Sequence, residues 1–299
     1  AENLDYYRRI GKTFAFENVS VERDSAVIYS DTLTDFAFEK KSIADGNVRI
    51  DDKKSKMKAS GRHLENYSND EYTLIDGNAS LVKPENEKDT LFIYSNILES
   101  FRKNNEYYFA RDSVNIIRGD FLAKSGLAKY YLKYSGEKDF ITLTLEPIVW
   151  QKEIQLTGDS IYAELENNKV QQVYAHKLKI LPDSKFSFLL LKSDTLFSDR
   201  YDQIKGNNIT LYFANDKLNR IRVDSNSSGI YYAYEENKGN GVNFIEGEFM
   251  TLYFDSTQKV TKVLVEKNPI GKYVPEPLIT TVDRQLQGFI LRNDKPYKR

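Results

Sequence analysis

"IKGNNITLYFANDKLNRIRV", residues 204–223, contains the pattern that decides the fold. After its Gly-Asn-Asn opening, apolar side chains alternate with polar ones at Ile209, Leu211 and Phe213, and a second apolar run returns after an Asn-Asp turn. Alternation of this kind is typical of a half-buried strand, and Gly, Asn and Asp favour tight turns. The stretch therefore predicts a β-hairpin with one apolar face.

Related hairpins occur at 158–175 and 247–265, where apolar residues occupy matching places. Their opening phrase is an apolar residue, a spacer, a glycine and a polar residue. The same phrase recurs upstream, and from Gly77 onward the glycines are 42, 39, 48 and 41 residues apart. Self-similarity at a period of about 40 residues indicates stacked supersecondary units. The Gly-Asn and Gly-Asp pairs are predicted to form a tight turn or bend entering each strand.

The composition supports an all-β chain. It includes 21 Tyr and 17 Phe, which suit a pleated surface, and helical periodicity is weak, allowing at most one short helix at 96–105. We expect roughly 15–20 strands. Because each hairpin must bury one apolar face against its neighbours, the predicted fold is an elongated open β-jellyroll of stacked antiparallel strands, in one or two segments.

The repeats and the prolines suggest four regions. Residues 1–23 are a lead-in, 24–145 a first jellyroll segment, 146–266 a second segment, and 267–299 an extended arm. The four prolines of the arm argue against a central strand, so we expect it to cover a sheet edge, to dock a partner or to be partly disordered. We expect the Trp150 side chain to have a structural role.

Charge and cysteine content exclude several classes. Lys and Arg total 43 and Asp and Glu 44, for a net charge of −1, which leaves no electrostatic footprint for nucleic acid. Without cysteine there is no disulfide or thiolate metal site. His63 and His176 stand 113 residues apart without a metal-binding frame. We therefore expect no metal and no cofactor.

Catalytic motifs are weak. No Gly-x-Ser-x-Gly elbow is present. Carboxylates are numerous, but Asp120 and Asp159 fall in the recurring Gly-Asp phrase, where a backbone cap is a better interpretation than an acid catalyst. We expect a protein that is not an enzyme.

Several stretches together resemble a known family. "GDSIYAELENNKV", "KGNNITLYFANDKLNRIRVDSNSSGIYYAY", "GVNFIEGEFMTLYFD" and "PIVWQKEIQLTGD" are similar to OstA-like proteins of the lipopolysaccharide-transport A (LptA/OstA) family, in the long form of Bacteroidetes-type bacteria. The resemblance covers about 24–299 and is clearest over 147–265.

The resemblance implies a periplasmic protein that carries lipopolysaccharide toward the outer membrane of a Gram-negative cell. It implies lipid A acyl chains held in an apolar β-groove. The implied partners are jellyroll domains of other transport proteins at the strand edges, or further copies joined head to tail. The opening residues lack the apolar core of a signal peptide and could follow a cleaved one.

The apolar stripe of the hairpins is the candidate lipid-binding groove, although the same residues could simply form a core. An alternative function is a structural or adhesive β-solenoid with a filled core and no lipid ligand, and a third is a secreted carbohydrate-active protein. The candidate groove residues are Ile161, Leu165, Val173, Ile209, Leu211, Phe213, Ile221, Val223, Met250, Leu252, Phe254 and Val263.

Overall fold

The protein consists of two compact, almost wholly β units. Contacts between residues group Ala1–Ile141 with Pro296–Arg299 as unit 1, and Thr142–Lys295 as unit 2. The division falls inside β10, four residues before the predicted boundary at 145/146, and the lead-in 1–23 belongs to unit 1. The computed structural model describes residues 1–23, 25–84, 90–103, 106–135, 138–166, 169–178, 185–192, 197–215, 217–235 and 238–298.

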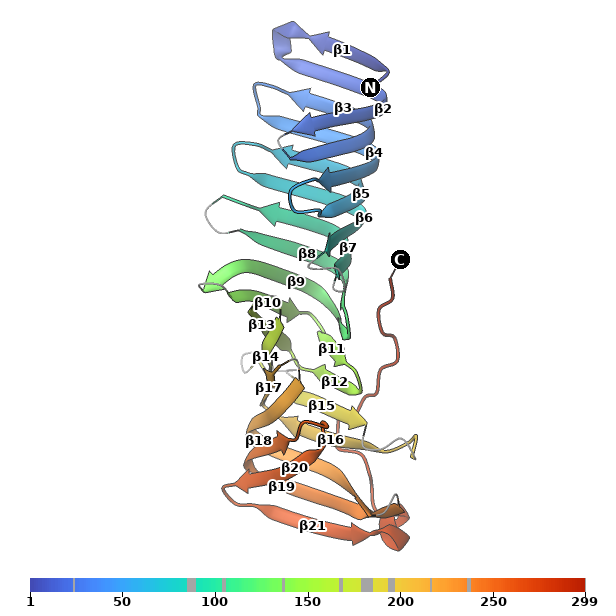
Figure 1. The fold of residues 1–299 in the computed structure, drawn as a ribbon, viewed down its shortest axis with the longest axis vertical. Coiled ribbons are helices and arrows are strands. Elements are labelled where there is room, and N and C mark those ends of the chain that lie inside the picture. Colours follow the sequence, from blue (N-terminus) through green and yellow to red (C-terminus); the bar gives the residue numbers. More distant parts are fainter. Residues whose placement is uncertain are drawn as a thin grey trace. The chain divides into compact units, whose positions relative to one another are not determined.

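Unit 1 is a ladder of antiparallel strands in chain order, with each strand from β1 to β8 paired to the next (Figure 1). A short 3-10 turn, η1 (Arg8–Ile10), links the first two strands. The strands are β1 (Asn3–Tyr7), β2 (Lys12–Arg23), β3 (Ala26–Phe36), β4 (Lys41–Asp52), β5 (Lys58–Tyr67), β6 (Tyr72–Pro84), β7 (Thr90–Phe101), β8 (Tyr107–Arg118), β9 (Phe121–Ser135) and the first residues of β10 (Lys138–Thr144).

Unit 2 is also antiparallel, but its strands are shorter and its chain order is less regular. β19 pairs with β18 on one side and with both β20 and β21 on the other. A 3-10 helix, η2 (Glu276–Thr281), follows the last strand. The strands are β11 (Ile148–Gln151), β12 (Ile154–Thr157), β13 (Ser160–Glu166), β14 (Lys169–His176), β15 (Ser187–Lys192), β16 (Tyr201–Gly206), β17 (Asn208–Ala214), β18 (Lys217–Glu235), β19 (Lys238–Phe254), β20 (Val260–Glu266) and β21 (Ile270–Pro275).

The long strands of unit 1 bend in the middle. Every ladder from β2–β3 to β8–β9 shifts register there, and alternate strands carry two consecutive residues with positive φ, as at Gly46–Asn47 and Gly77–Asn78. Such bulges bend a strand and raise its twist. Each strand from β2 to β9 thus contributes one half to a first wall, which includes 41–45 and 72–76, and the other half to a second wall, which includes 48–52 and 79–84.

The recurring glycine phrase marks these corners. Gly46 and Gly77 lie inside β4 and β6 rather than at a strand entrance. In unit 2, Gly158 lies between β12 and β13, Gly206 is the last residue of β16, and Gly247 lies in β19. Only at the β8–β9 turn, at Gly119–Asp120, does the phrase form a plain hairpin turn. The phrase repeats because the chain crosses from wall to wall at regular intervals.

Gly77→Ala should lower the free energy of unfolding by about 1–3 kcal/mol. Gly77 has a φ of +78°, and a Cβ there would lie 2.7 Å from the Cβ of Arg62, so alanine adds left-handed strain and a close contact. The measurement is urea denaturation. Gly271→Ala is the matched control, because a Cβ at Gly271 meets nothing within 4 Å; equal effects of the two substitutions would contradict the corner role.

Unit 2 also has two walls. The first, here called the hairpin wall, consists of β13, β14, β17, the first half of β18, the second half of β19, and β20. The other, the arm wall, consists of β11, β12, β15, β16, the second half of β18, the first half of β19, and β21. The three hairpins singled out by the sequence are neighbours in the hairpin wall.

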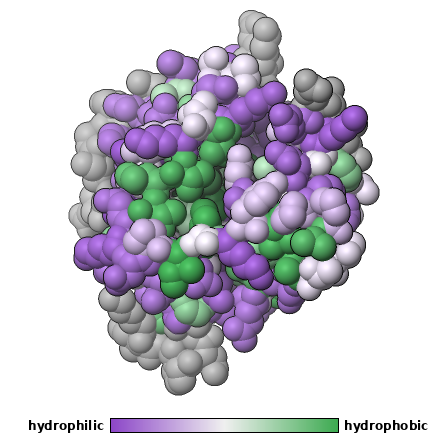
Figure 2. All heavy atoms as spheres, turned by 90° about the horizontal axis from the view of Figure 1, so that it is seen from below, coloured by the Kyte–Doolittle hydropathy of each residue, from purple (hydrophilic) through white to green (hydrophobic). Residues whose placement is uncertain are grey.

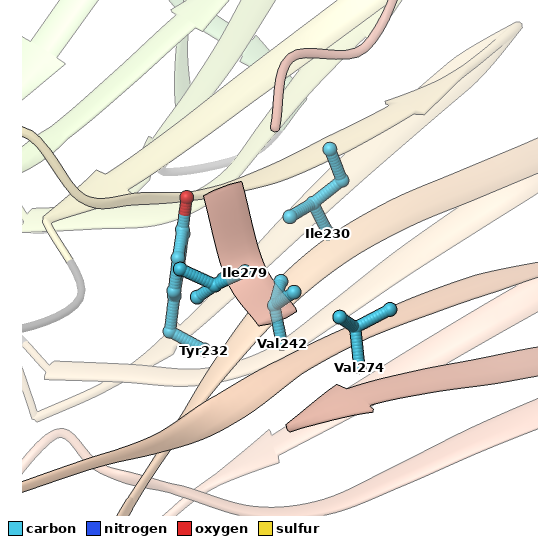
Figure 3. Packing of buried hydrophobic residues seen from close by; sticks show 5 residues of the cluster. All are labelled: Ile230, Tyr232, Val242, Val274 and Ile279. Carbon is cyan, nitrogen blue, oxygen red and sulfur yellow. The ribbon is translucent and has the colours of Figure 1, made fainter. Parts of the chain in front are cut away.

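The arm wall is covered on both faces. In β15, Phe188, Leu189 and Leu190 are all buried, as expected for a strand with no wet face. Leu189 and Ile204 face the hairpin wall, and the opposite face is covered by η2 and the extended segment 282–295. Figure 3 shows the buried cluster at the end of this face, formed by Ile230, Tyr232, Val242, Val274 and Ile279.

The fold class predicted from the sequence is confirmed: the chain is almost entirely β, and its pairings are antiparallel. Twenty-one strands are described, slightly more than expected. The short helix allowed at 96–105 is wrong, because β7 continues to Phe101; residues 104 and 105 lie outside the described ranges. Across the part of the chain that the structure describes, no helix has the length and apolar character needed to cross a membrane.

The arm differs from the prediction in the part of the sheet that it covers. Its first part, β21, pairs with β19 as an edge strand ending at Pro275, which agrees with the exclusion of a central strand. The segment from 282 onward covers a sheet face rather than an edge. Trp150, 2% exposed, lies beneath it and donates Nε1–H to the carbonyl of Arg292 at 3.3 Å, so its structural role is confirmed.

Candidate functional site

Two continuous apolar rows line the interior of unit 1. Each row consists of residues that face one another across successive ladders, and each residue comes from a different strand from β2 to β9. The first wall contributes Ala15, Leu33, Ala44, Leu64, Ile75, Leu98, Ala110 and Ala128. The second wall contributes Val21, Ile28, Ile50, Ala59, Leu81, Ile93, Ile116 and Ala123.

A cavity of about 140 Å³ lies between these rows. Both walls line it: Ile75, Leu98 and Ala110 belong to the first row, and Ala59 and Ile93 to the second. Alanines leave space that larger residues would fill. An apolar cavity of about this size stays dry and accepts a small hydrocarbon, so this part of unit 1 is suited to hold a segment of an apolar ligand.

The interior changes character between the corner and the rim. Near the corner, small side chains such as Val48, Ala79 and Val114 are 1% exposed, because the walls converge there. We call the edge of the walls that lies away from the corners the rim. Toward the rim, the first wall carries a polar row that also lines the cavity, formed by Thr73, Ser100, Tyr108 and Tyr130. An apolar interior bordered by hydroxyl groups is suited to an amphipathic ligand.

The charged groups at the rim have local partners. Arg102 donates to Thr73 Oγ1 at 3.3 Å, and Asp52 Oδ1 caps a turn by accepting the N–H of Lys54 at 2.8 Å. Burial, and then the charge of Glu106, raise the pKa of the Tyr108 phenol. This hydroxyl therefore stays neutral and serves as a hydrogen-bonding group rather than an anion.

The twelve predicted groove residues share one face of the hairpin wall. Val173, Leu211, Ile221, Leu252 and Val263 form one row across the ladders, and the others lie in the rows beside it. Ten of the twelve are at most 8% exposed, and only Phe254 and Val263 on the last strands are half-buried. None of the twelve lines the unit 1 cavity. Their contact with lipid stays a prediction.

Sequence reasoning missed the unit 1 cavity because it followed the clearest repeat. The two central rows of the hairpin wall contain Ala at two of twelve places, Ala163 and Ala175, whereas the unit 1 rows contain Ala at six of sixteen places. Alanine at inward-facing strand positions, among larger apolar residues, is the signal that could have indicated spare volume. It is weak, because one alanine says nothing about the residue opposite.

The residues considered for metal binding or acid catalysis have structural partners. His63 Nδ1 lies 2.6 Å from Asp45 Oδ1, and His176 Nδ1 lies 3.1 Å from Asn208 Oδ1. Asp159 accepts the backbone N–H of Leu178 and of Lys185, which confirms the predicted cap. Among the described residues, no group of three His, Asp or Glu side chains is placed to hold a metal ion.

A half-buried carboxylate in unit 2 should make stability depend on pH. Burial raises the pKa of Asp202 to about 7, although the Tyr232 N–H donated to Oδ1 at 3.0 Å opposes this. The unfolded chain releases this proton near pH 4, so between about pH 4 and pH 7 the folded state binds more protons. The free energy of unfolding should therefore fall by a few kcal/mol as the pH rises through this window.

Asp202→Asn should remove that part of the slope. Urea denaturation of both proteins at several pH values between 4 and 8 measures it. A variant with the same pH dependence as the parent would show that Asp202 titrates normally.

Comparisons with known proteins find a likeness in structure but not in sequence families. No family model matches the chain, and no curated protein matches it. Among solved structures, the chain is similar to LptH of Pseudomonas aeruginosa, described as the LptA-homologous periplasmic component of the lipopolysaccharide transport device. The TM-score is 0.34 and the sequence identity 15%, over 52% of this chain and 93% of that one.

Proposed function

We propose that this protein is a non-enzymatic carrier that shields the acyl chains of an amphipathic lipid, with the unit 1 cavity as its first binding site. The observation that carries the proposal is an apolar cavity between two facing rows, bordered by polar groups at the rim. Each buried methylene contributes about 0.8 kcal/mol, so the interior can replace water around hydrocarbon without covalent chemistry. Directional transfer would need an energy source elsewhere.

The lipid proposed is lipopolysaccharide, and the place of action is the periplasm of a Gram-negative cell. This finer assignment rests on the sequence resemblance to the lipopolysaccharide-transport A family, in its Bacteroidetes-type form. In that role the protein contributes to outer-membrane biogenesis.

Strand edges are the proposed contacts with partners. β1 pairs with β2, and its five residues are exposed, with Leu4 and Tyr6 each 62% exposed. On unit 2, the last strands leave Ile270 65% and Tyr273 50% exposed. Viewed from the β21 side, hydrophobic side chains lie in a recess framed by hydrophilic ones (Figure 2). Edges of this kind can accept a further strand from another jellyroll domain or from a second copy.

One observation favours the alternative of a structural β-solenoid. The predicted groove residues of unit 2 are almost completely buried, as a filled core requires. The two functions differ in a measurable way, because a solenoid binds no lipid while a carrier does.

Native mass spectrometry of the protein purified from a Gram-negative periplasm, with lipid extraction from the same sample, tests the proposal. We expect co-purifying lipid A species that added lipopolysaccharide displaces. A lipid-free mass that does not change on titration with lipopolysaccharide would favour the filled solenoid. If acyl lipid of another class co-purified, the proposed carrier function would stand and lipopolysaccharide would be replaced as its ligand.

A further inference from the structure

The outer face of the arm wall contains two buried glutamines in an otherwise apolar row. Trp150, Gln155, Leu190, Gln203 and Ile230 face one another across successive ladders. Gln155 is 5% exposed and Gln203 is 2% exposed. Burying an amide in apolar surroundings is costly unless its hydrogen bonds are satisfied, so the partners of these amides reveal what the face is built to contact.

Both glutamines bind the main chain of the arm in the same way. Gln203 Nε2 donates to the carbonyl of Arg284 at 2.7 Å, and its Oε1 accepts the N–H of Leu286 at 2.8 Å. Gln155 Nε2 donates to the carbonyl of Ile290 at 2.7 Å, and its Oε1 accepts the N–H of Arg292 at 2.9 Å. Each amide therefore pairs with residues two apart on the arm, as a neighbouring strand would.

Two further side chains also donate hydrogen bonds to the main chain of the arm. Trp150 Nε1 donates to the carbonyl of Arg292 and Lys205 Nζ to that of Gln287. Among the arm's own side chains, Leu286 packs against the buried cluster at the end of the face. Recognition through main-chain groups with a few apolar anchors is how extended peptides bind a sheet, and it tolerates changes elsewhere in the peptide.

We propose that this face is a binding site for an extended peptide, which we call the glutamine seam, and that the arm of a second copy can occupy it in place of the chain's own arm. A second copy carries the same main-chain pattern and the same Leu286 anchor, so an exchanged arm makes the same contacts. Tethering favours the intramolecular arm, and reciprocal exchange gives a symmetric dimer. The proposal is independent of the lipid-carrier function.

A labelled peptide of residues 282–295 tests the seam. The receptor is the full chain carrying Leu286→Asp, which weakens its own arm and leaves the seam intact. Fluorescence anisotropy should show saturable binding. Adding Gln155→Leu and Gln203→Leu to this receptor should weaken binding at least tenfold, since both amide pairs are lost, while circular dichroism checks the fold.

Backbone methylation makes the test specific. A peptide N-methylated at Leu286 or at Arg292 cannot donate to Gln203 or Gln155 and should also bind at least tenfold more weakly. N-methylation at Leu291, whose N–H is not one of those bound by the glutamines, is the matched control. Absence of binding to a folded Leu286→Asp chain, or equal binding of all methylated peptides, would overturn the seam.

Arm exchange is measured on the unmodified chain. This experiment still tests the proposal if the Leu286→Asp variant does not fold. Normal and ¹⁵N-labelled preparations are mixed at high concentration and analysed by native mass spectrometry. We expect mixed dimers that disappear in the Gln155→Leu, Gln203→Leu protein and on addition of excess arm peptide. Only monomers, or dimers insensitive to both treatments, would overturn arm exchange.

Discussion

Ala59→Phe should weaken acyl-lipid binding at least tenfold while the protein stays folded.

 Ala59 lies in the second row, is 7% exposed and lines the cavity. A phenyl ring at this position would occupy the space between the two rows that we assign to hydrocarbon. Displacement of a fluorescent fatty acid, followed by titration with lipopolysaccharide, measures the loss.

The control for this substitution is Ala37→Phe, which adds the same ring at an exposed position outside the cavity. It should leave lipid capture unchanged. Overfilling a packed core costs about 1–3 kcal/mol, whereas filling an existing cavity costs less, so thermal denaturation should show Ala59→Phe still folded. A folded Ala59→Phe protein with unchanged lipid capture would remove the cavity from the proposed function.

Trp150→Ala should lower the free energy of unfolding by about 3–5 kcal/mol, the usual cost of deleting a large buried aromatic side chain. Trp150 is 2% exposed, and its indole both fills the outer face of the arm wall and holds the carbonyl of Arg292. Its loss leaves a cavity under the arm and removes that hydrogen bond. Urea denaturation followed by far-UV circular dichroism measures the change, since the chain has a single tryptophan and the variant lacks that fluorophore.

Trp150→Phe separates packing from hydrogen bonding. It keeps a ring in the site and loses the N–H donor, so its cost should be only about 1–2 kcal/mol. If the alanine and phenylalanine variants were equally stable, the indole would not be packed as the structure describes.

Much of the fold follows from short-range patterns in the sequence. The alternation in 204–223 predicts a strand, and its repetition predicts stacked hairpins, which β13–β14, β17–β18 and β19–β20 confirm. The predicted stripe indeed shares one face of the hairpin wall, because side-chain direction in a strand depends only on its period of two. The run at 188–191 also carried a local signal, since apolar residues on both faces indicate a strand covered twice.

Long-range features could not be read in the same way. The corner role of Gly77 depends on the approach of Arg62 from the neighbouring strand. The arm contacts join Gln155 to Ile290 and Gln203 to Arg284 across more than 80 residues of sequence. Nothing in the local sequence of Gln155 or Gln203 distinguishes a buried amide from an exposed one.

The all-β class, the hairpins and the faces that their side chains share follow from the amino-acid sequence, because these features depend on neighbouring residues and on the pleat of a strand. Which interior keeps a cavity and what covers the arm wall are known from the three-dimensional packing alone. Cavity volume depends on the summed sizes of side chains on two facing walls, as at Ala59 and Ala110. The cover of the arm wall depends on where a distant segment of chain comes to lie.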